Sequence, residues 1–371
     1  MDAALHVLAF VAGAFIIQAI LRSAIRTVVV PRGEQTLITR KTFLLLRAIY
    51  ELFGRFQRTT GDRERTLARY APMALLSLAA FWAAGTIVGF ILLFWSVGMH
   101  DLRQCMYLSG SSITTLGVTQ PKGGPESALA FAEAFIGLGI VALLISYLPT
   151  IYQLFSRREA EVVKLDVRAG SPPTALEMLT RYQRIGWISE LDDTWAGWET
   201  WFAELEESHS SYPALVFFRS QRPGSSWITC AGAVLDTASI SLAAIDAPRG
   251  PQAAVMLRAG FMALRTIARF YGVPIDDHPE PNAPISIYRE EFFLLYDELG
   301  KVGLPMRPDK EQAWRDFAGW RVNYDAALVA LCALVGAPPT PWSADRIHRF
   351  HRPTFVKPTW RVDPPDTPPS W

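Results

Sequence analysis

Residues 108–121, LSGSSITTLGVTQP, decide the fold because they place a short Ser-, Thr- and Gly-rich stretch between two long apolar segments. The stretch is too short to form a domain, and it contains no charged side chain. Non-helical backbone at membrane depth is tolerated only where protein buries it or where it lines water. We therefore consider two places for this stretch: a pore loop, or a tight turn between two membrane helices.

Three segments of the chain are suited to cross a membrane. A bilayer core about 30 Å thick needs roughly 20 apolar helical residues. Residues 71–99 and 134–156 meet this requirement without one charged side chain, and residues 3–21 form a shorter apolar stretch. A signal peptide would begin with basic residues, whereas residues 3–21 follow Asp2 and precede Arg22. We expect the first segment to be retained as a membrane helix.

The basic residues predict how these segments are oriented. Residues 22–69 contain eleven Arg and Lys side chains, whereas residues 100–126 contain only Arg103 and Lys122. Cytoplasmic connectors carry the excess of basic residues. We therefore expect the N-terminus outside and the C-terminus in the cytoplasm, in a bacterial inner membrane. The amphipathic part of the connector, residues 36–56, suits either the inner membrane surface or packing against the C-terminal domain.

Overall composition excludes several other classes of function. The net charge of +1 creates no general field that would attract nucleic acid, so we expect no nucleic-acid partner. The three cysteines, Cys105, Cys230 and Cys332, lie far apart without a CxxC spacing. This pattern indicates buried thiols and neither a disulfide framework nor a zinc site. We expect no cofactor and no bound metal besides a permeant cation.

The chemistry of a cation filter matches the middle of the quoted stretch. Residues 101–126 are long enough for a short helix over 102–113 followed by an extended return. A filter directs carbonyl oxygens at the ion, and it needs a Thr hydroxyl, small residues, and Gly where the backbone leaves ordinary dihedral space. The sequence supplies these requirements in order at Thr114, Thr115, Leu116 and Gly117.

Residues 107–121 and 133–160 resemble the pore module of the tetrameric potassium-channel superfamily. The resemblance covers roughly residues 70–160, and it extends to bacterial two-helix ion-channel proteins with an added N-terminal helix and a helical tail. It implies an all-α membrane protein that forms a homotetramer. Each subunit would contribute an outer helix, a pore helix, a filter and an inner helix, and the cytoplasmic domain would be mainly helical.

The resemblance assigns the filter residue by residue. The residues that match its Thr, Val, first Gly and aromatic positions are Thr115, Leu116, Gly117 and Val118. Thr119 replaces the second Gly, and Gln120 at the outer mouth replaces an Asp. A β-branched residue is strained where the backbone favours positive φ, so we expect the outer part of the filter to have a different shape. The permeant ion is expected to be K⁺, and Na⁺ stays open as an alternative.

Candidate gate and support residues follow the filter. Gly137 and Gly139 suit either a bend in the inner helix or close packing against a neighbour, because Gly weakens a helix interior. Pro149 removes a backbone hydrogen bond and would kink the helix near its cytoplasmic end. Glu133 has two alternative uses, either reaching the membrane interface or bracing the filter through a hydrogen bond behind it.

The C-terminal half has regular charge and Pro-rich joints. Its apolar spacing predicts helices over residues 174–185, 193–207, 211–220, 252–271, 286–299 and 310–335. No GxGxxG fingerprint follows a strand, so the sequence does not support a nucleotide-binding regulatory domain. The ligand of the cytoplasmic domain is unknown. We divide the chain into an N-terminal transmembrane helix (1–30), a basic connector (31–69), a pore domain (70–160), a helical cytoplasmic domain (161–360) and a Pro-rich tail (361–371).

The sequence thus predicts a cation channel with a TTLGV-type filter, gated at the inner helix. The alternative is a membrane-anchored sensor or scaffold whose pore module does not conduct. An enzyme is not expected, because no nucleophile, base and orienting group can be assigned together.

Overall fold

The computed structural model describes residues 2–30, 69–220, 222, 224–247, 250–351 and 361–362, and in the connector residues 42, 45–46, 48–50, 52–53 and 66. Most of the predicted amphipathic stretch 36–56 and of the tail 361–371 lies outside these residues. The chain divides into two compact units. We call residues 1–55 and 69–153 the N-terminal unit, and residues 56–68 and 154–371 the C-terminal unit.

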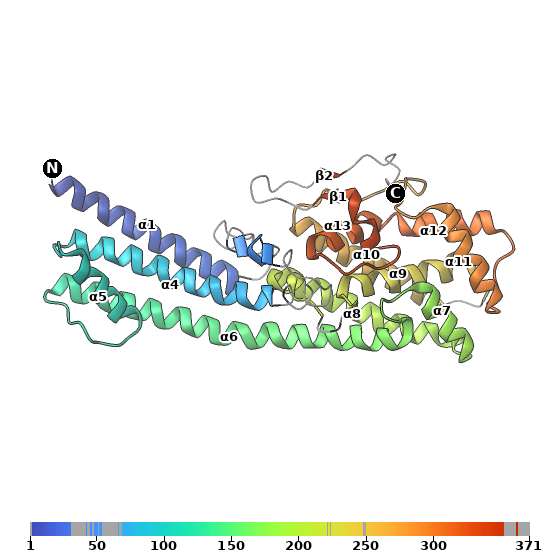
Figure 1. Ribbon diagram of the computed structural model, residues 1–371, viewed down its shortest axis with the longest axis horizontal. Coiled ribbons are helices and arrows are strands. Elements are labelled where there is room, and N and C mark those ends of the chain that lie inside the picture. The colour runs from blue at the N-terminus through green and yellow to red at the C-terminus, as the bar shows by residue number, and fades with distance from the viewer. Residues whose placement is uncertain are drawn as a thin grey trace. The chain divides into compact units, whose positions relative to one another are not determined.

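Four helices with described bounds make up most of the N-terminal unit outside the connector (Figure 1). They are α1 (Asp2–Val28), α4 (Tyr70–Ser96), α5 (Leu102–Ile113) and α6 (Gly124–Ala169), whose residues from Leu154 onward belong to the C-terminal unit. By length and apolar composition α1, α4 and α6 can each cross a membrane. These helices indicate a membrane protein. The predicted spans 3–21 and 134–156 lie within α1 and α6, and α4 covers all but the last three residues of the span predicted over 71–99.

The packing of α1 on α4 depends on close backbone approach. A Cβ atom on Gly13 would lie 2.6 Å from the carbonyl oxygen of Gly89. Small residues at such a crossing let two membrane helices approach closely. Further along the same pair, the indole nitrogen of Trp82 donates to the hydroxyl of Ser23 at 3.2 Å. The two helices are therefore joined by both close contact and a polar bond.

The C-terminal unit is a helical assembly around a buried central helix (Figure 1). Its α-helices are α7 (Ala175–Arg184), α8 (Leu191–Ser211), α9 (Trp227–Ala244), α10 (Gln252–Phe270), α11 (Arg289–Lys301), α12 (Lys310–Arg321) and α13 (Asp325–Val335). Two short strands, β1 (Phe350–His351) and β2 (Arg361–Val362), pair antiparallel. The central helix α9 contacts α7, α10, α12 and α13.

Helix α9 is the element that the sequence prediction missed. It is the fourth helix in the described residues that is long and apolar enough to cross a membrane, yet 94% of its apolar window is buried inside the structure. A helix buried on every face has no amphipathic period by which to recognise it.

The three cysteines are buried thiols, as the sequence predicts. Cys230 on α9 and Cys332 on α13 are fully buried, as is Cys105 in the N-terminal unit.

Two predicted helices of this unit differ from the observed elements. The helix predicted over 211–220 is instead a short 3-10 helix, Pro213–Phe217, which begins at a proline that has no N–H to donate. The helix predicted over 310–335 is divided into α12 and α13. The side-chain amide of Asn323 donates to the carbonyls of Gly319 and Trp320 at 3.0 and 3.2 Å, and it thereby competes with continuation of the helix.

Candidate functional site

Helix α5 holds the start of the candidate filter. It spans Leu102–Ile113, the bounds expected for the pore helix, and the side chain of Asp101 caps it by accepting from the amide of Arg103 at 2.9 Å. At its other end the hydroxyl of Thr114 donates to the carbonyl of Gly110 at 2.5 Å. Because α5 packs on α4, the loop leaves from a helix with a fixed position in its unit.

The backbone after α5 adopts the left-handed conformation at two alternate residues. Thr115 has a φ of 56° and Gly117 a φ of 68°, whereas Leu116 between them has no positive φ. The amides of Thr115 and Leu116 each donate to a carbonyl at the end of α5 at 3.0 Å, which holds this turn. Positive φ strains a β-branched residue, but glycine adopts it freely. The strained position is Thr115, and Thr119, where the sequence suggested strain, has no positive φ.

The return of the loop is tied to α5 and exposes apolar groups. The amide of Thr119 donates to the hydroxyl of Ser111 at 3.2 Å. In the single chain Leu116 and Val118 are 68% and 76% exposed, and Gln120 is also exposed. The loop therefore presents an uncharged surface that its own unit does not cover.

Glu133 lies directly behind α5. It is 0% exposed, and its Oε1 accepts a hydrogen bond of 2.5 Å from the hydroxyl of Ser109. Its Oε2 is buried and has no hydrogen-bond partner in the part of the chain that the structure describes. This is the contact that the bracing alternative requires, and an interfacial position would leave the side chain exposed.

The three candidate gate residues have different surroundings within α6, which is continuous through all of them. A Cβ atom on Gly137 would lie 2.3 Å from the carbonyl oxygen of Ile113 at the end of α5, so glycine permits close packing there. A Cβ atom on Gly139 would meet nothing within 4 Å. Pro149 is exposed inside the helix. Of the two uses considered for the glycines, packing accounts for Gly137.

The acids nearest to the loop are engaged with backbone amides. Glu126 accepts from the amides of Lys122 and Gly123 at 2.7 and 3.0 Å, and Asp101 caps α5. Among the described residues, no three His, Cys, Asp or Glu side chains are grouped as metal ligands. An ion at the loop would therefore be held by backbone carbonyls and hydroxyls.

Sequence reasoning did not identify Ser109 and Ser111 as part of this site. Both are buried on α5, where one binds Glu133 and the other binds the return of the loop. Their signal in the sequence was the position of two small polar residues on the helix just before the candidate filter. No family model, curated protein or solved structure matches this chain.

Proposed function

We propose that the chain is one subunit of a homotetrameric cation channel that conducts through the loop after α5. The observation that carries the proposal is the turn at Thr115–Gly117. Hydrogen bonds to the end of α5 hold this turn, and α5 in turn binds the buried Glu133. Ions would lose water to carbonyl and hydroxyl oxygens over residues 114–119 and pass down their gradient.

The alternation of backbone handedness supports a filter. In a chain that alternates between right- and left-handed residues, successive carbonyls turn toward the same side. Thr115 and Gly117 are left-handed on either side of Leu116. Rows of carbonyl oxygens are what a cation filter uses in place of hydration water. The left-handed Thr115 also ends α5 as an ordinary helix cap, because the amides of Thr115 and Leu116 donate to the carbonyls of Ser112 and Ser111. Such a cap needs neither the second left-handed residue, Gly117, nor the buried acid behind α5.

Exposed apolar surface in the middle of α6 supports assembly in a membrane. A large apolar patch on a single chain indicates contact with lipid or with another protein. The exposed side chains are Phe131, Phe135, Leu138, Val141 and Ile145. One loop cannot surround an ion, so closed cyclic symmetry is needed, and we take it to be four-fold.

The proposed setting follows the distribution of charge. The excess of basic residues in the connector supports a cytoplasmic connector in a bacterial inner membrane, with the N-terminus outside and the C-terminal unit inside. Its partners would be the bilayer, three further copies, and a cytoplasmic regulator whose identity is unknown. Gating would involve the inner helix between Gly137 and Pro149.

The permeant ion is proposed to be K⁺, with Na⁺ as the alternative to be measured. Gln120 provides no charge at the outer mouth, and Val118 and Thr119 depart from the potassium-channel pattern. The same departures favour the second candidate function, a membrane-anchored sensor or scaffold with a pore module that does not conduct.

Cation efflux from proteoliposomes loaded with K⁺ or Na⁺ tests the proposal. We expect flux from the native protein and none from Gly117→Ala, because alanine resists the φ of 68° at this position. The control is Gly124→Ala, since a Cβ atom there meets nothing within 4 Å. Absence of flux from a folded tetramer would support the scaffold, and unchanged flux in Gly117→Ala would refute the filter assignment.

A further inference from the structure

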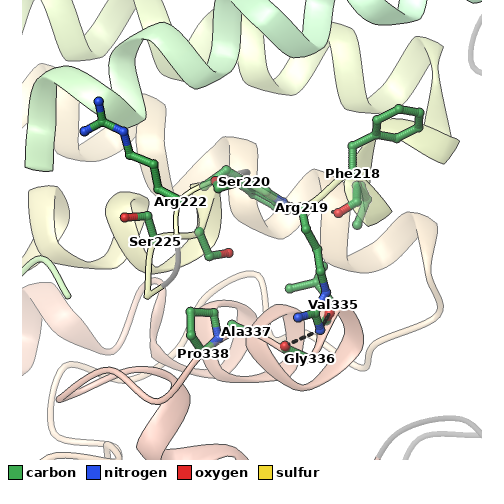
Figure 2. Close-up of a pocket in the computed structure, with 12 residues that line it drawn as sticks. Phe218, Arg219, Ser220, Arg222, Ser225, Val335, Gly336, Ala337 and Pro338 are labelled. Carbon is green, nitrogen blue, oxygen red and sulfur yellow. Dashed lines mark hydrogen bonds between the residues drawn. The ribbon is translucent and has the colours of Figure 1, made fainter. Parts of the chain in front are cut away.

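A cavity in the C-terminal unit lies between the start of α9 and the end of α13 (Figure 2). Its enclosed volume is about 30 Å³, which suits a compact group and not a drug-sized ligand. Its polar lining includes Ser220, Ser225 and Ser226. Its apolar wall includes Phe218, Val335 and Pro338.

The N-terminus of α9 is buried without a cap. Trp227, Ile228 and Thr229 are at most 1% exposed, and their amides donate no hydrogen bond within the described part of the chain. The first amides of a helix require an external partner, and a buried end without one is unusual. The preceding residue, Ser226, has the extended backbone of an N-cap, but its side chain forms no capping hydrogen bond.

Two serine hydroxyls at the cavity also lack partners. Ser226 is 7% exposed and lines the cavity, and its hydroxyl forms no hydrogen bond to a described residue. The hydroxyl oxygen of Ser220, in the same lining, is buried without a partner among the described residues. These two side chains are observations independent of the helix end, and Trp227, the first residue of α9, lines the same cavity.

One guanidinium group supplies positive charge to this cavity. Arg219 donates through Nη2 to the carbonyls of Val335, at 2.9 Å, and Gly336, which offsets the negative end of α13. Figure 2 shows Arg219 extending toward these residues, while Arg222 extends away from them. Nη1 of Arg222 lies 3.5 Å from Asp166, which also accepts from the hydroxyl of Ser225 at 2.9 Å.

The groups left without partners are all suited to a compact anion. They comprise backbone amides at the positive end of a helix and hydroxyls beside an arginine, and no carboxylate of a described residue lines the cavity. We propose that this cavity binds a single phosphate group, either as inorganic phosphate or as the terminal group of a small phosphomonoester. The site is independent of whether the pore conducts.

Thermal unfolding of the full chain in detergent tests the site. Inorganic phosphate should raise the midpoint in a saturable manner, and chloride at matched ionic strength should not. Glycerol phosphate in a parallel titration distinguishes a free anion from a phosphomonoester. If neither phosphate compound raises the midpoint of the native protein, the proposal is wrong.

The variant Ser226→Asp separates binding from folding. An aspartate at the N-cap accepts from the free amides and places its own carboxylate in the position of the ligand. It should raise the midpoint without phosphate and abolish the further rise that phosphate produces. Arg315→Met is the matched control, because this arginine is exposed on α12 and does not line the cavity, and it should keep the phosphate response. A full phosphate response in Ser226→Asp would overturn the proposal.

Discussion

The two units bury acidic side chains in opposite ways. In the C-terminal unit, Asp236 accepts from the guanidinium of Arg321 and from the hydroxyl of Tyr324, and Arg321 also binds Asp325 at 2.8 Å. In the N-terminal unit, Glu133 has one partner, Ser109, and one oxygen left over. The first network closes on itself and serves the fold, whereas the second leaves an acceptor behind the candidate filter.

Electrostatics maintain the charge in the closed network. Burial by itself lowers the pKa of Arg321, but the adjacent carboxylates of Asp236 and Asp325 raise it by more. The guanidinium therefore stays charged at all ordinary pH values. A buried charge that is paired on both sides is stable only as long as each partner is present.

The largest expected effect is that of Arg321→Met, which removes the cation shared by two buried carboxylates. We expect a loss of about 3–5 kcal/mol in the free energy of unfolding of the C-terminal unit, measured by chemical denaturation in detergent. Arg315→Met is the control, because Arg315 is exposed and binds only Gln312 on its own helix. Equal losses in both variants would contradict the conclusion that the buried network around Arg321 stabilises the C-terminal unit.

The N-terminal unit depends on close contact between helices, and a matched glycine pair tests this. Gly137→Ala places a methyl group against the carbonyl of Ile113, so we expect a loss of up to about 3 kcal/mol. Gly139→Ala has open space, and in a helix interior alanine is favoured over glycine by about 1 kcal/mol. Thermal unfolding midpoints should move in opposite directions. Parallel shifts would contradict the close packing of α6 on α5.

Removing the partner of Glu133 has a smaller expected effect. Ser109→Ala leaves the buried carboxyl without a hydrogen bond, which costs about 2 kcal/mol, and the filter loses its brace. Ser112→Ala, whose hydroxyl donates only to Leu108 on the same helix, should cost less than half as much. The readouts are the unfolding midpoint and cation flux. Flux unchanged by Ser109→Ala would show that Glu133 does not brace the filter.

The smallest effect is a pH dependence at His209 in the C-terminal unit. Burial and the nearby Arg158 lower the pKa of this imidazole well below its ordinary value. Below pH about 6.5 the unfolded chain binds a proton that the folded chain excludes. The free energy of unfolding therefore decreases as the pH is lowered, by up to about 1.4 kcal/mol per pH unit.

Unfolding midpoints at pH 7.5 and 5.5 measure this loss, and His209→Gln should reduce it. In the native unit Nδ1 of His209 lies 2.9 Å from the carbonyl of Leu205, and Nε2 lies 3.2 Å from Arg158 Nη1. These contacts fit a neutral ring that donates from Nδ1 and accepts at Nε2. An equal pH slope in the variant would assign the loss to other groups.

Some of the structure was predictable because it follows from local patterns. The uncharged segments marked the long helices, and the short helix predicted over 102–113 from the length of the connector has the bounds of α5. Helix α9 was not predictable, because burial on every face removes the period. The Ser109–Glu133 contact joins residues of two different helices, and no local pattern in the sequence records that pairing.

The burial of all three cysteines has a practical consequence for chemical labelling. Cys105, Cys230 and Cys332 are 0% exposed, so a thiol-reactive probe meets no accessible thiol of the native chain. A single cysteine introduced at the exposed Leu116 or Val118 would then be the only reactive site. Protection of that thiol on assembly, or by added K⁺, would report directly on which atoms of the loop face the other subunits and the ion.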